Sequence, residues 1–243
     1  MGCNDSAPDD YRFTEPLYTI PRVARYIGMV PSTLRSWVRG YTQHFPDRPP
    51  VHGDPILKEF RGSERGPTLP YISFAEAFIL ASFREAGVSL QHIRRALRRL
   101  EDELDLEHVL ASRMLYHDGR RIFYGTLEES EDSQERRAAE KLFEVVSGNY
   151  VFVPVVRRYL ERVSWDEQSR PKRLILPITE RPILAAHPYT AAGKPVFRAS
   201  GAPLEDIIAR WKAGDSFEFL SKDYEVPVED LREALLTTQL ARA

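Results

Sequence analysis

The chain has 243 residues, of which 42% are hydrophobic and 29% charged, and its formal net charge is −2 at pH 7. This composition excludes wholesale disorder, and the length allows one large or two small domains. The longest apolar run, residues 77–83, is shorter than the roughly 20 residues that cross a bilayer, and no secretory signal pattern opens the sequence. Cys3 is the single cysteine, so no internal disulfide can form. We therefore expect a cytoplasmic protein with no membrane partner.

Charge is distributed unevenly along the chain. Residues 18–100 carry thirteen basic and six acidic side chains, a net charge of +7. Residues 203–243 carry five basic and nine acidic side chains, a net charge of −4. Opposite charges on two parts of one chain predict two different roles, and the basic part is the candidate for binding a polyanion.

Residues 18–40 predict two short helices joined by a tight turn. Thr19 can cap the first helix, and Gly28 supplies the backbone freedom that a sharp turn requires. The second helix begins at Pro31, and three of its apolar residues should face the core: Leu34, Trp37 and Val38. Its opposite face carries small hydroxyls and arginines, which can reach base edges and phosphates: Ser32, Thr33, Arg35, Ser36 and Arg39. Spacing alone favours a DNA-reading helix and an ordinary solvent-exposed helix equally.

Residues 40–70 are rich in Pro, Gly, Asp and His, and they show little periodicity. They predict a loop or a short hairpin. Basic side chains recur along this segment, as expected of a wing that contacts phosphates beside a recognition helix: Arg48, Lys58, Arg61 and Arg65. We therefore predict that Lys58, Arg61 and Arg65 bind DNA together with the outward face of the second helix.

A second pair of helices follows. Ser73 and Glu76 fit a capping box at the start of the first of them, and Gly87 separates it from the next. That next helix should bury an apolar stripe of Ile93, Leu97, Leu100 and Leu104. Four arginines lie off the stripe and either flank DNA or solubilise the helix, the second role being favoured: Arg94, Arg95, Arg98 and Arg99.

Two quoted stretches, TIPRVARYIGMVPSTLRSWVRG and YISFAEAFILASFREAGVSLQHIRRAL, resemble the DNA-binding domain of MerR-type transcription regulators over residues 18–102. In that family a helix-turn-helix is followed by a wing and a second helix pair. The resemblance implies that the groove is read by Ser32, Thr33, Arg35, Ser36 and Arg39. The chain departs from the family at Val30, where a capping Ser or Thr is usual, and the segment between the helix pairs is longer than usual. No long heptad run follows, so a dimerising coiled coil is not predicted.

The rest of the chain predicts acidic connections and a helical module. Acidic connecting helices and a hairpin with its turn at Asp118 and Gly119 precede a C-terminal set of three helices. Pro203 begins the first of the three, Gly214 ends it and Pro227 begins the third. The predicted parts are a flexible tail at 1–17, a winged helix domain at 18–102, the connection at 103–170 and the C-terminal module at 171–243.

The charge of the C-terminal module argues against DNA as its partner. Glu229, Asp230 and Glu233 would line the third helix and repel phosphates. The segment GKPVFRASGAPLEDIIARWKAGDSFEFLSKDYEVPVEDLREALL resembles the helical module of unknown function found in VapB-type antitoxins, over about residues 181–238. That resemblance implies an antitoxin that binds a PIN-type ribonuclease toxin and represses its own operon. The family's usual G-T-R-x-P is replaced by ASGAP at residues 199–203, so the arginine of that motif is missing.

A catalytic constellation is not visible in the sequence. The six histidines are scattered and no cysteine pair accompanies them, so we expect no metal site and no cofactor. Gly-rich phosphate loops and nucleophile elbows are also missing, so we do not expect an enzyme.

These observations favour a mainly α-helical protein with small β-hairpins, which joins an N-terminal winged helix-turn-helix to a C-terminal three-helix module. The expected partners are double-stranded DNA and a PIN-type ribonuclease toxin. A homodimer is expected, because one recognition helix alone gives poor specificity. The alternatives are a free-standing MerR-like transcription regulator without a toxin and an adaptor that does not bind DNA.

Overall fold

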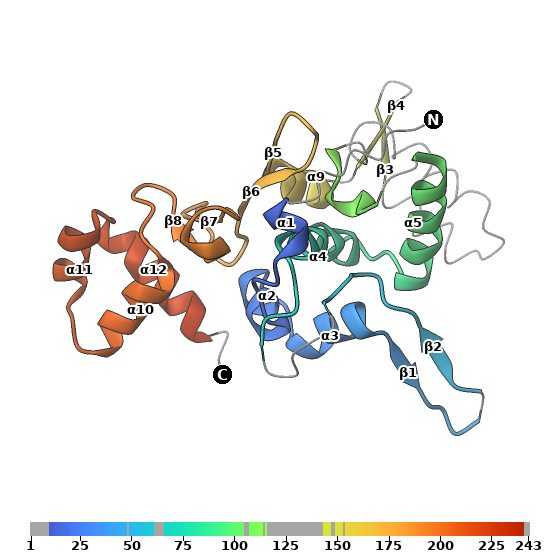
Figure 1. Ribbon diagram of the computed structural model, residues 1–243, viewed down its shortest axis with the longest axis horizontal. Coiled ribbons are helices and arrows are strands. Elements are labelled where there is room, and N and C mark those ends of the chain that lie inside the picture. Colours follow the sequence, from blue (N-terminus) through green and yellow to red (C-terminus); the bar gives the residue numbers. More distant parts are fainter. Residues whose placement is uncertain are drawn as a thin grey trace. The chain divides into compact units, whose positions relative to one another are not determined.

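The computed structural model is mainly helical, with short antiparallel strand pairs, and this confirms the predicted fold class (Figure 1). It describes residues 10–47, 49–60, 66–104, 107–113, 115, 143–146, 149–152 and 154–240. The chain forms two compact units that alternate along the sequence. The first unit comprises residues 1–31, 58–74 and 175–243, and the second comprises residues 32–57 and 75–174.

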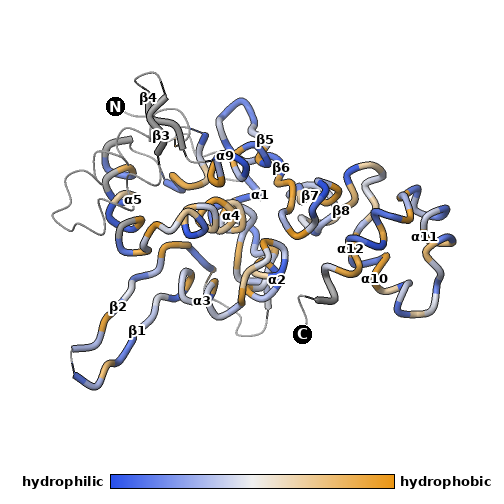
Figure 2. The backbone as a smooth tube through the Cα atoms, turned by 180° about the vertical axis from the view of Figure 1, so that it is seen from behind, coloured by the Kyte–Doolittle hydropathy of each residue, from blue (hydrophilic) through white to orange (hydrophobic). Residues whose placement is uncertain are grey.

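Helix α4 (Tyr71–Glu85) is apolar on all its faces, and orange segments follow it in Figure 2. From position 71 to position 80 every side chain is at most 5% exposed. A helix that is hydrophobic all round has to be enclosed by protein. The predicted capping box is wrong, because α4 begins two residues earlier and Ser73 lies inside it. The Ser73 hydroxyl donates to the Lys58 carbonyl (2.7 Å), and the Glu76 carboxylate lies 3.2 Å from Nδ1 of His108.

In the first unit, two buried tyrosines bond to β7 (Leu184–Ala186) and to the chain between β7 and β8 (Val196–Phe197): one precedes α2 (Ile20–Tyr26) and the other begins α4. Tyr18 precedes α2, is 2% exposed, and donates from its hydroxyl to the Gly193 carbonyl at 2.7 Å. Tyr71 likewise donates to the Ala186 carbonyl at 3.3 Å. A Cβ on Gly193 would lie 2.2 Å from the Tyr18 hydroxyl. This close approach explains why the GKP motif begins with glycine.

Glu205, on the first C-terminal helix, gathers three donors in the first unit. Its carboxylate accepts from the Tyr26 hydroxyl (3.1 Å) and pairs with Arg22 (3.4 Å) and Lys194 (3.2 Å). Burial alone would raise the pKa of Glu205, but the Lys194 hydrogen bond, the Arg22 charge and the Tyr26 hydrogen bond outweigh burial and lower it. Glu205 therefore ties the predicted DNA-binding helix pair, through α2, to the C-terminal module.

The three predicted C-terminal helices are confirmed as α10 (Leu204–Lys212), α11 (Phe217–Tyr224) and α12 (Val228–Leu240). The Ser216 hydroxyl caps α11 by accepting from the Phe219 amide at 3.2 Å. Two of the acids predicted to line α12 are ion-paired, because Arg181 contacts Asp230 at 2.6 Å and Glu233 at 2.7 Å. Leu220 and Leu231 are among the side chains that fill the centre of the module.

The second unit begins with α3 (Pro31–Arg39) and a hairpin of β1 (Tyr41–Gln43) and β2 (Val51–Gly53). Its later elements are α5 (Leu90–Leu104), the short helix η1 (Val109–Ala111), the strand pair β3 (Phe143–Val146) and β4 (Asn149–Phe152), α9 (Pro154–Glu161) and β5 (Val163–Trp165). Strand β5 pairs with β6 (Pro171–Ile175) in antiparallel orientation. Ring contact between Phe78 and Tyr159 (4.9 Å between centroids) packs α9 against α4.

Two predicted segments differ from expectation or lie outside the described residues. The predicted tail at 1–17 contains the short helix α1 (Tyr11–Thr14), capped by Asp10, whose carboxylate pairs with the buried Arg12 at 2.7 Å. The predicted hairpin turn at Asp118 and Gly119 lies outside the described residues. Within the described part of the chain, no helix is both long and apolar enough to cross a membrane.

We predict that Glu205→Gln destabilises the protein by about 1 kcal/mol at pH 7, since it weakens three charge-assisted contacts. The pKa of Glu205 is lowered in the folded state. The stabilisation is therefore present above the unfolded-state pKa and is lost as pH falls through the folded-state value. Urea titrations of both proteins at pH 7 and below pH 4 should show the difference shrinking at low pH. Asp206→Asn, in the same helical turn, is the matched control, and an equal loss for both variants would contradict the prediction.

Candidate nucleic-acid interface

Helix α3 presents the predicted polar face to solvent. Leu34, Trp37 and Val38 are at most 3% exposed, as the helical spacing predicted. The opposite face is accessible to solvent. Ser36 is half-buried there, and the other four side chains are exposed: Ser32, Thr33, Arg35 and Arg39. The Ser36 hydroxyl donates to the Thr33 carbonyl at 2.7 Å. The helix carries two arginines and no acid, so its surface can approach phosphates without repulsion.

The turn before α3 has the geometry that the sequence predicted. Gly28 has a φ of +69°, a left-handed conformation that glycine adopts without strain. The Met29 amide donates to the Ala24 carbonyl at 2.7 Å and closes the end of α2. Val30 is 63% exposed and has no oxygen to cap α3, in keeping with the departure noted in the sequence.

A short hairpin leaves the end of α3, and Figure 1 shows it extending from that helix as β1 and β2. Tyr41 pairs with Gly53 across the strands. A Cβ on Gly53 would lie 2.2 Å from the Tyr41 ring, and one on Gly40 would lie 2.6 Å from the Gly53 carbonyl oxygen. Both positions therefore require glycine. On the polar side of the hairpin, the Thr42 hydroxyl lies 3.0 Å from Nδ1 of His52.

Helix α5 holds the base of this hairpin through Arg94. This side chain is 8% exposed, its Nε donates to the Asp54 carbonyl at 2.8 Å, and its guanidinium carbon lies 5.7 Å from the Tyr41 ring centroid. One turn along α5, Arg98 pairs with the Asp54 carboxylate at 3.0 Å. The prediction that the α5 arginines solubilise the helix is wrong for Arg94, because its guanidinium is buried against the hairpin. Arg95 and Arg98 do have exposed side chains.

The chain returning from the hairpin also fastens to α3. The amides of Ile56 and Leu57 both donate to the Trp37 carbonyl, at 2.7 and 3.1 Å. A helix leaves its last carbonyls without partners inside the helix, so these bonds satisfy one that would otherwise be unpaired. The hairpin is therefore attached at its start to α3, at its base to α5 and at its end to α3 again. This arrangement matches a recognition helix with a wing beside it.

The predicted wing charges lie differently from the expectation. The hairpin ends at Gly53, so Lys58 lies beyond it, in the first compact unit, and its backbone carbonyl accepts from Ser73. Arg48, Arg61 and Arg65 lie outside the described residues. The structure thus groups the α3 side chains with the hairpin.

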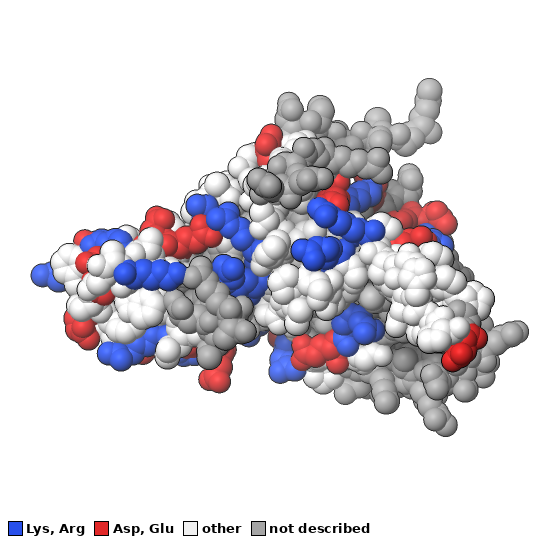
Figure 3. Space-filling model, turned by 90° about the horizontal axis from the view of Figure 1, so that it is seen from below, with Lys and Arg blue, Asp and Glu red and all other residues white. Residues whose placement is uncertain are grey.

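Helices α3 and α5 contribute four exposed cations to the second unit. These four cations are Arg35, Arg39, Arg95 and Arg98. Among the described residues, the acid Asp54 pairs with Arg98. In the space-filling view of Figure 3, both charge signs are interspersed over the face shown. The charge on the face shown is therefore mixed and does not form a large single-sign surface.

Sequence reasoning missed four residues of this site: Tyr41, Gly53, Asp54 and Arg94. The glycines at positions 40 and 53 were a signal, because they bracket the hairpin and each leaves room for a close approach. No comparable signal distinguishes Arg94 from its exposed neighbour Arg95. Within the described residues, no group of three or more His, Cys, Asp or Glu side chains is arranged to hold a metal ion.

Comparisons with known proteins define the class of this chain. Residues 16–97 match a family model described as "Putative DNA-binding HTH domain", and residues 185–236 match one described as "Protein of unknown function (DUF433)". The winged helix-turn-helix geometry and the first match together make this a helix-turn-helix protein with a C-terminal module.

Two relatives cover almost the whole chain. The "Putative antitoxin VapB45" of Mycobacterium tuberculosis is 34% identical over 230 residues, which are 93% of this chain and 95% of the relative. The X-ray crystal structure of Rv2018 from Mycobacterium tuberculosis matches with a TM-score of 0.79 at 31% identity and covers 92% of this chain and 99% of its own. The chain therefore belongs to the VapB45 family.

We predict that Arg94→Met loosens the hairpin without touching the α3 surface. The variant keeps an apolar stem but loses the hydrogen bond to Asp54 and the contact with Tyr41, so the protein should lose about 2 kcal/mol of stability. Amide hydrogen exchange should accelerate in β1 and β2 more than in α3. Arg95→Met, one residue along α5, is the control. Unchanged exchange in the hairpin of Arg94→Met would show that the anchor has no effect.

Proposed function

We propose that this protein is a DNA-binding antitoxin. The observation that carries the proposal is the exposed Ser/Thr/Arg face of α3 with a hairpin fastened beside it by Arg94. Membership of the VapB45 family and the match of residues 16–97 to a DNA-binding helix-turn-helix model support the same reading. In this proposal Ser32, Thr33 and Arg35 contact base edges, while Ser36 and Arg39 complete the surface of the recognition helix.

The finer parts of the proposal concern the partners. The resemblance of the C-terminal module to that of VapB-type antitoxins supports a PIN-type ribonuclease as the toxin and the protein's own operon as the DNA target. Lys58, Arg61 and Arg65 would add phosphate contacts outside the hairpin. The protein would act as a homodimer, because two recognition helices reading paired half-sites give the specificity that one helix lacks. Its work needs binding and no catalysis, in the cytoplasm where the operator lies.

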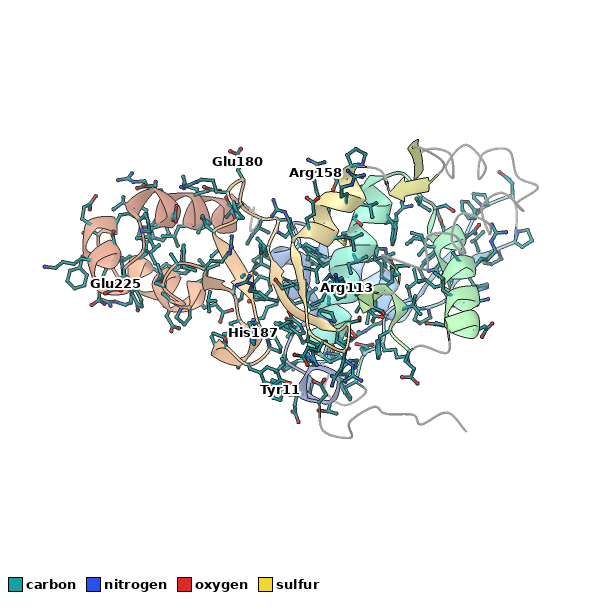
Figure 4. All side chains as sticks on the ribbon, turned by 90° about the horizontal axis from the view of Figure 1, so that it is seen from above. Tyr11, Arg113, Arg158, Glu180, His187 and Glu225 are labelled. Atoms are coloured by element: carbon teal, nitrogen blue, oxygen red, sulfur yellow. The ribbon has the colours of Figure 1, made fainter. Side chains whose placement is uncertain are left out.

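Arg35→Ala should weaken binding to the protein's own upstream DNA by roughly tenfold, since a base-edge contact is worth about 1–3 kcal/mol. Binding to random DNA should change much less. Fluorescence anisotropy with both DNAs at several salt concentrations measures the effect. Arg158→Ala is the matched control, because this arginine is also exposed (Figure 4) and lies on α9, away from α3 in Figure 1.

A phosphate contact should behave differently from a base contact. Arg61→Ala should lower affinity for specific and random DNA alike and reduce the slope of log affinity against log salt by about 1. If Arg35→Ala and Arg61→Ala both bind like the unaltered protein, the assignment of α3 as the recognition helix is refuted.

The antitoxin role has its own test. Expression of the gene adjacent to this one should arrest growth of a bacterial host, and co-expression of this protein should restore growth. Purified together, the two proteins should form a complex on size exclusion. Growth arrest that this protein does not relieve, or the absence of a complex, would leave a free-standing transcription regulator as the better account.

A further inference from the structure

The C-terminal module carries two clusters, in each of which an arginine contacts an aromatic ring. We call the two together the aromatic–arginine surface: one cluster is Arg210, Phe219 and Tyr224, and the other is Arg232, Phe217 and Trp211. The guanidinium carbon of Arg210 lies 5.2 Å from the Phe219 centroid and 5.4 Å from the Tyr224 centroid. That of Arg232 lies 4.8 Å from the Phe217 centroid, and Phe217 stacks on Trp211 with 6.1 Å between centroids and 29° between planes.

This surface is held in place before any partner binds. Arg210 donates from Nε to the Asp215 carboxylate at 2.7 Å and also pairs with Asp223. The cap at Ser216 fixes the start of α11, from which Phe217 and Phe219 project. A side chain immobilised in the free protein loses little further entropy on binding, so association with this surface is less costly.

The Phe219 ring is not needed to fill the core of the module. Leu220, Leu231 and Leu235 fill that core and are at most 1% exposed, whereas the Phe219 ring is 53% exposed. A single exposed phenylalanine needs no explanation, but several aromatic rings grouped with two arginines have the composition of the energetic centre of protein–protein interfaces.

Charge decides which class of partner fits. The arginines are already paired with carboxylates, Arg210 with Asp215 and Asp223, and Arg232 with Glu218 at 3.7 Å. Residues 203–243 hold nine acids against five bases, and Glu225 lies at the outer edge of the module in Figure 4. A phosphate backbone would be repelled, so a nucleic acid does not fit. The complementary partner is a protein face with an apolar centre and a basic rim.

We propose that the aromatic–arginine surface is where this protein binds its toxin, through a basic-rimmed apolar face of that toxin. The proposal rests on the antitoxin function proposed above and adds the location and chemistry of the contact. Phe219 is its centre, and Glu225 belongs to its acidic rim.

The test is calorimetric titration of the full-length protein with the purified product of the adjacent gene. Phe219→Ala should weaken binding at least tenfold, as expected for an interface centre. Phe60→Ala is the matched control, since Phe60 is 40% exposed outside the module, and it should bind like the unaltered protein. Glu225→Lys should weaken binding more at low salt than at high salt, while Glu15→Lys, an exposed acid near α1, should have little effect.

Each outcome has a separate meaning. The circular dichroism spectrum and the DNA affinity of Phe219→Ala should equal those of the unaltered protein. This result excludes unfolding as the cause of weaker binding to the adjacent gene's product. If the unaltered protein binds the adjacent product and both Phe219→Ala and Glu225→Lys bind equally well, the surface is wrongly assigned while the antitoxin function stands. If Phe219→Ala instead dissociates a dimer of this chain, the surface belongs to a second copy. If the unaltered protein does not bind the product, the antitoxin function fails and this proposal fails with it.

Discussion

The proposed DNA surface depends on the contact between the buried Arg94 guanidinium and the base of the hairpin. A guanidinium removed from water is costly unless it is hydrogen-bonded, and here Nε donates to the Asp54 carbonyl at 2.8 Å while the Tyr41 ring lies beneath the group. Its buried Nη2 has no hydrogen-bond partner among the described residues. Tyr41 in turn occupies the space that a side chain at Gly53 would fill. A short two-stranded hairpin has little stability alone, so this contact decides where the hairpin stands beside α3.

A second set of polar contacts, made by Glu205, links the helices of the first compact unit. Glu205 accepts from Tyr26 and pairs with Arg22 on α2, and it also holds Lys194 of the GKP motif. The first helix of the helix-turn-helix is therefore bonded directly to the first helix of the C-terminal module. This bonding gives the two matched families a shared structural unit, although their residues lie more than a hundred positions apart in the sequence.

The periodic parts of the fold could be predicted from sequence, and the long-range polar contacts could not. The inward residues Leu34, Trp37 and Val38 follow from helical spacing, and the C-terminal helix boundaries follow from Pro203, Gly214 and Pro227. The predicted capping box is wrong because α4 begins two residues before Ser73, whose hydroxyl bonds to a carbonyl from another segment. Arg94 was predicted to face solvent for a related reason, because the pattern of residues along α5 does not show that the hairpin will pack over position 94.

The site was therefore predicted in part. The exposed face of α3 could be read from the sequence, because its polar residues occupy one side of a short helix. The support behind it needed the hairpin register, which pairs Tyr41 with Gly53 and brings Asp54 to α5. The acids of α12 were expected to repel phosphates, and the structure adds that Arg181 pairs with two of them.

The most direct test of the central claim places a cleavage reagent on α3. An iron chelate attached to Ser36→Cys in a Cys3→Ser background would generate hydroxyl radicals where the helix contacts DNA. If α3 is the recognition helix, the protein should cleave its own upstream DNA at two sites about one helical turn apart. The same reagent on Leu236→Cys, in the C-terminal module, should give no localised cleavage. Cleavage from position 236 and none from position 36 would contradict the account.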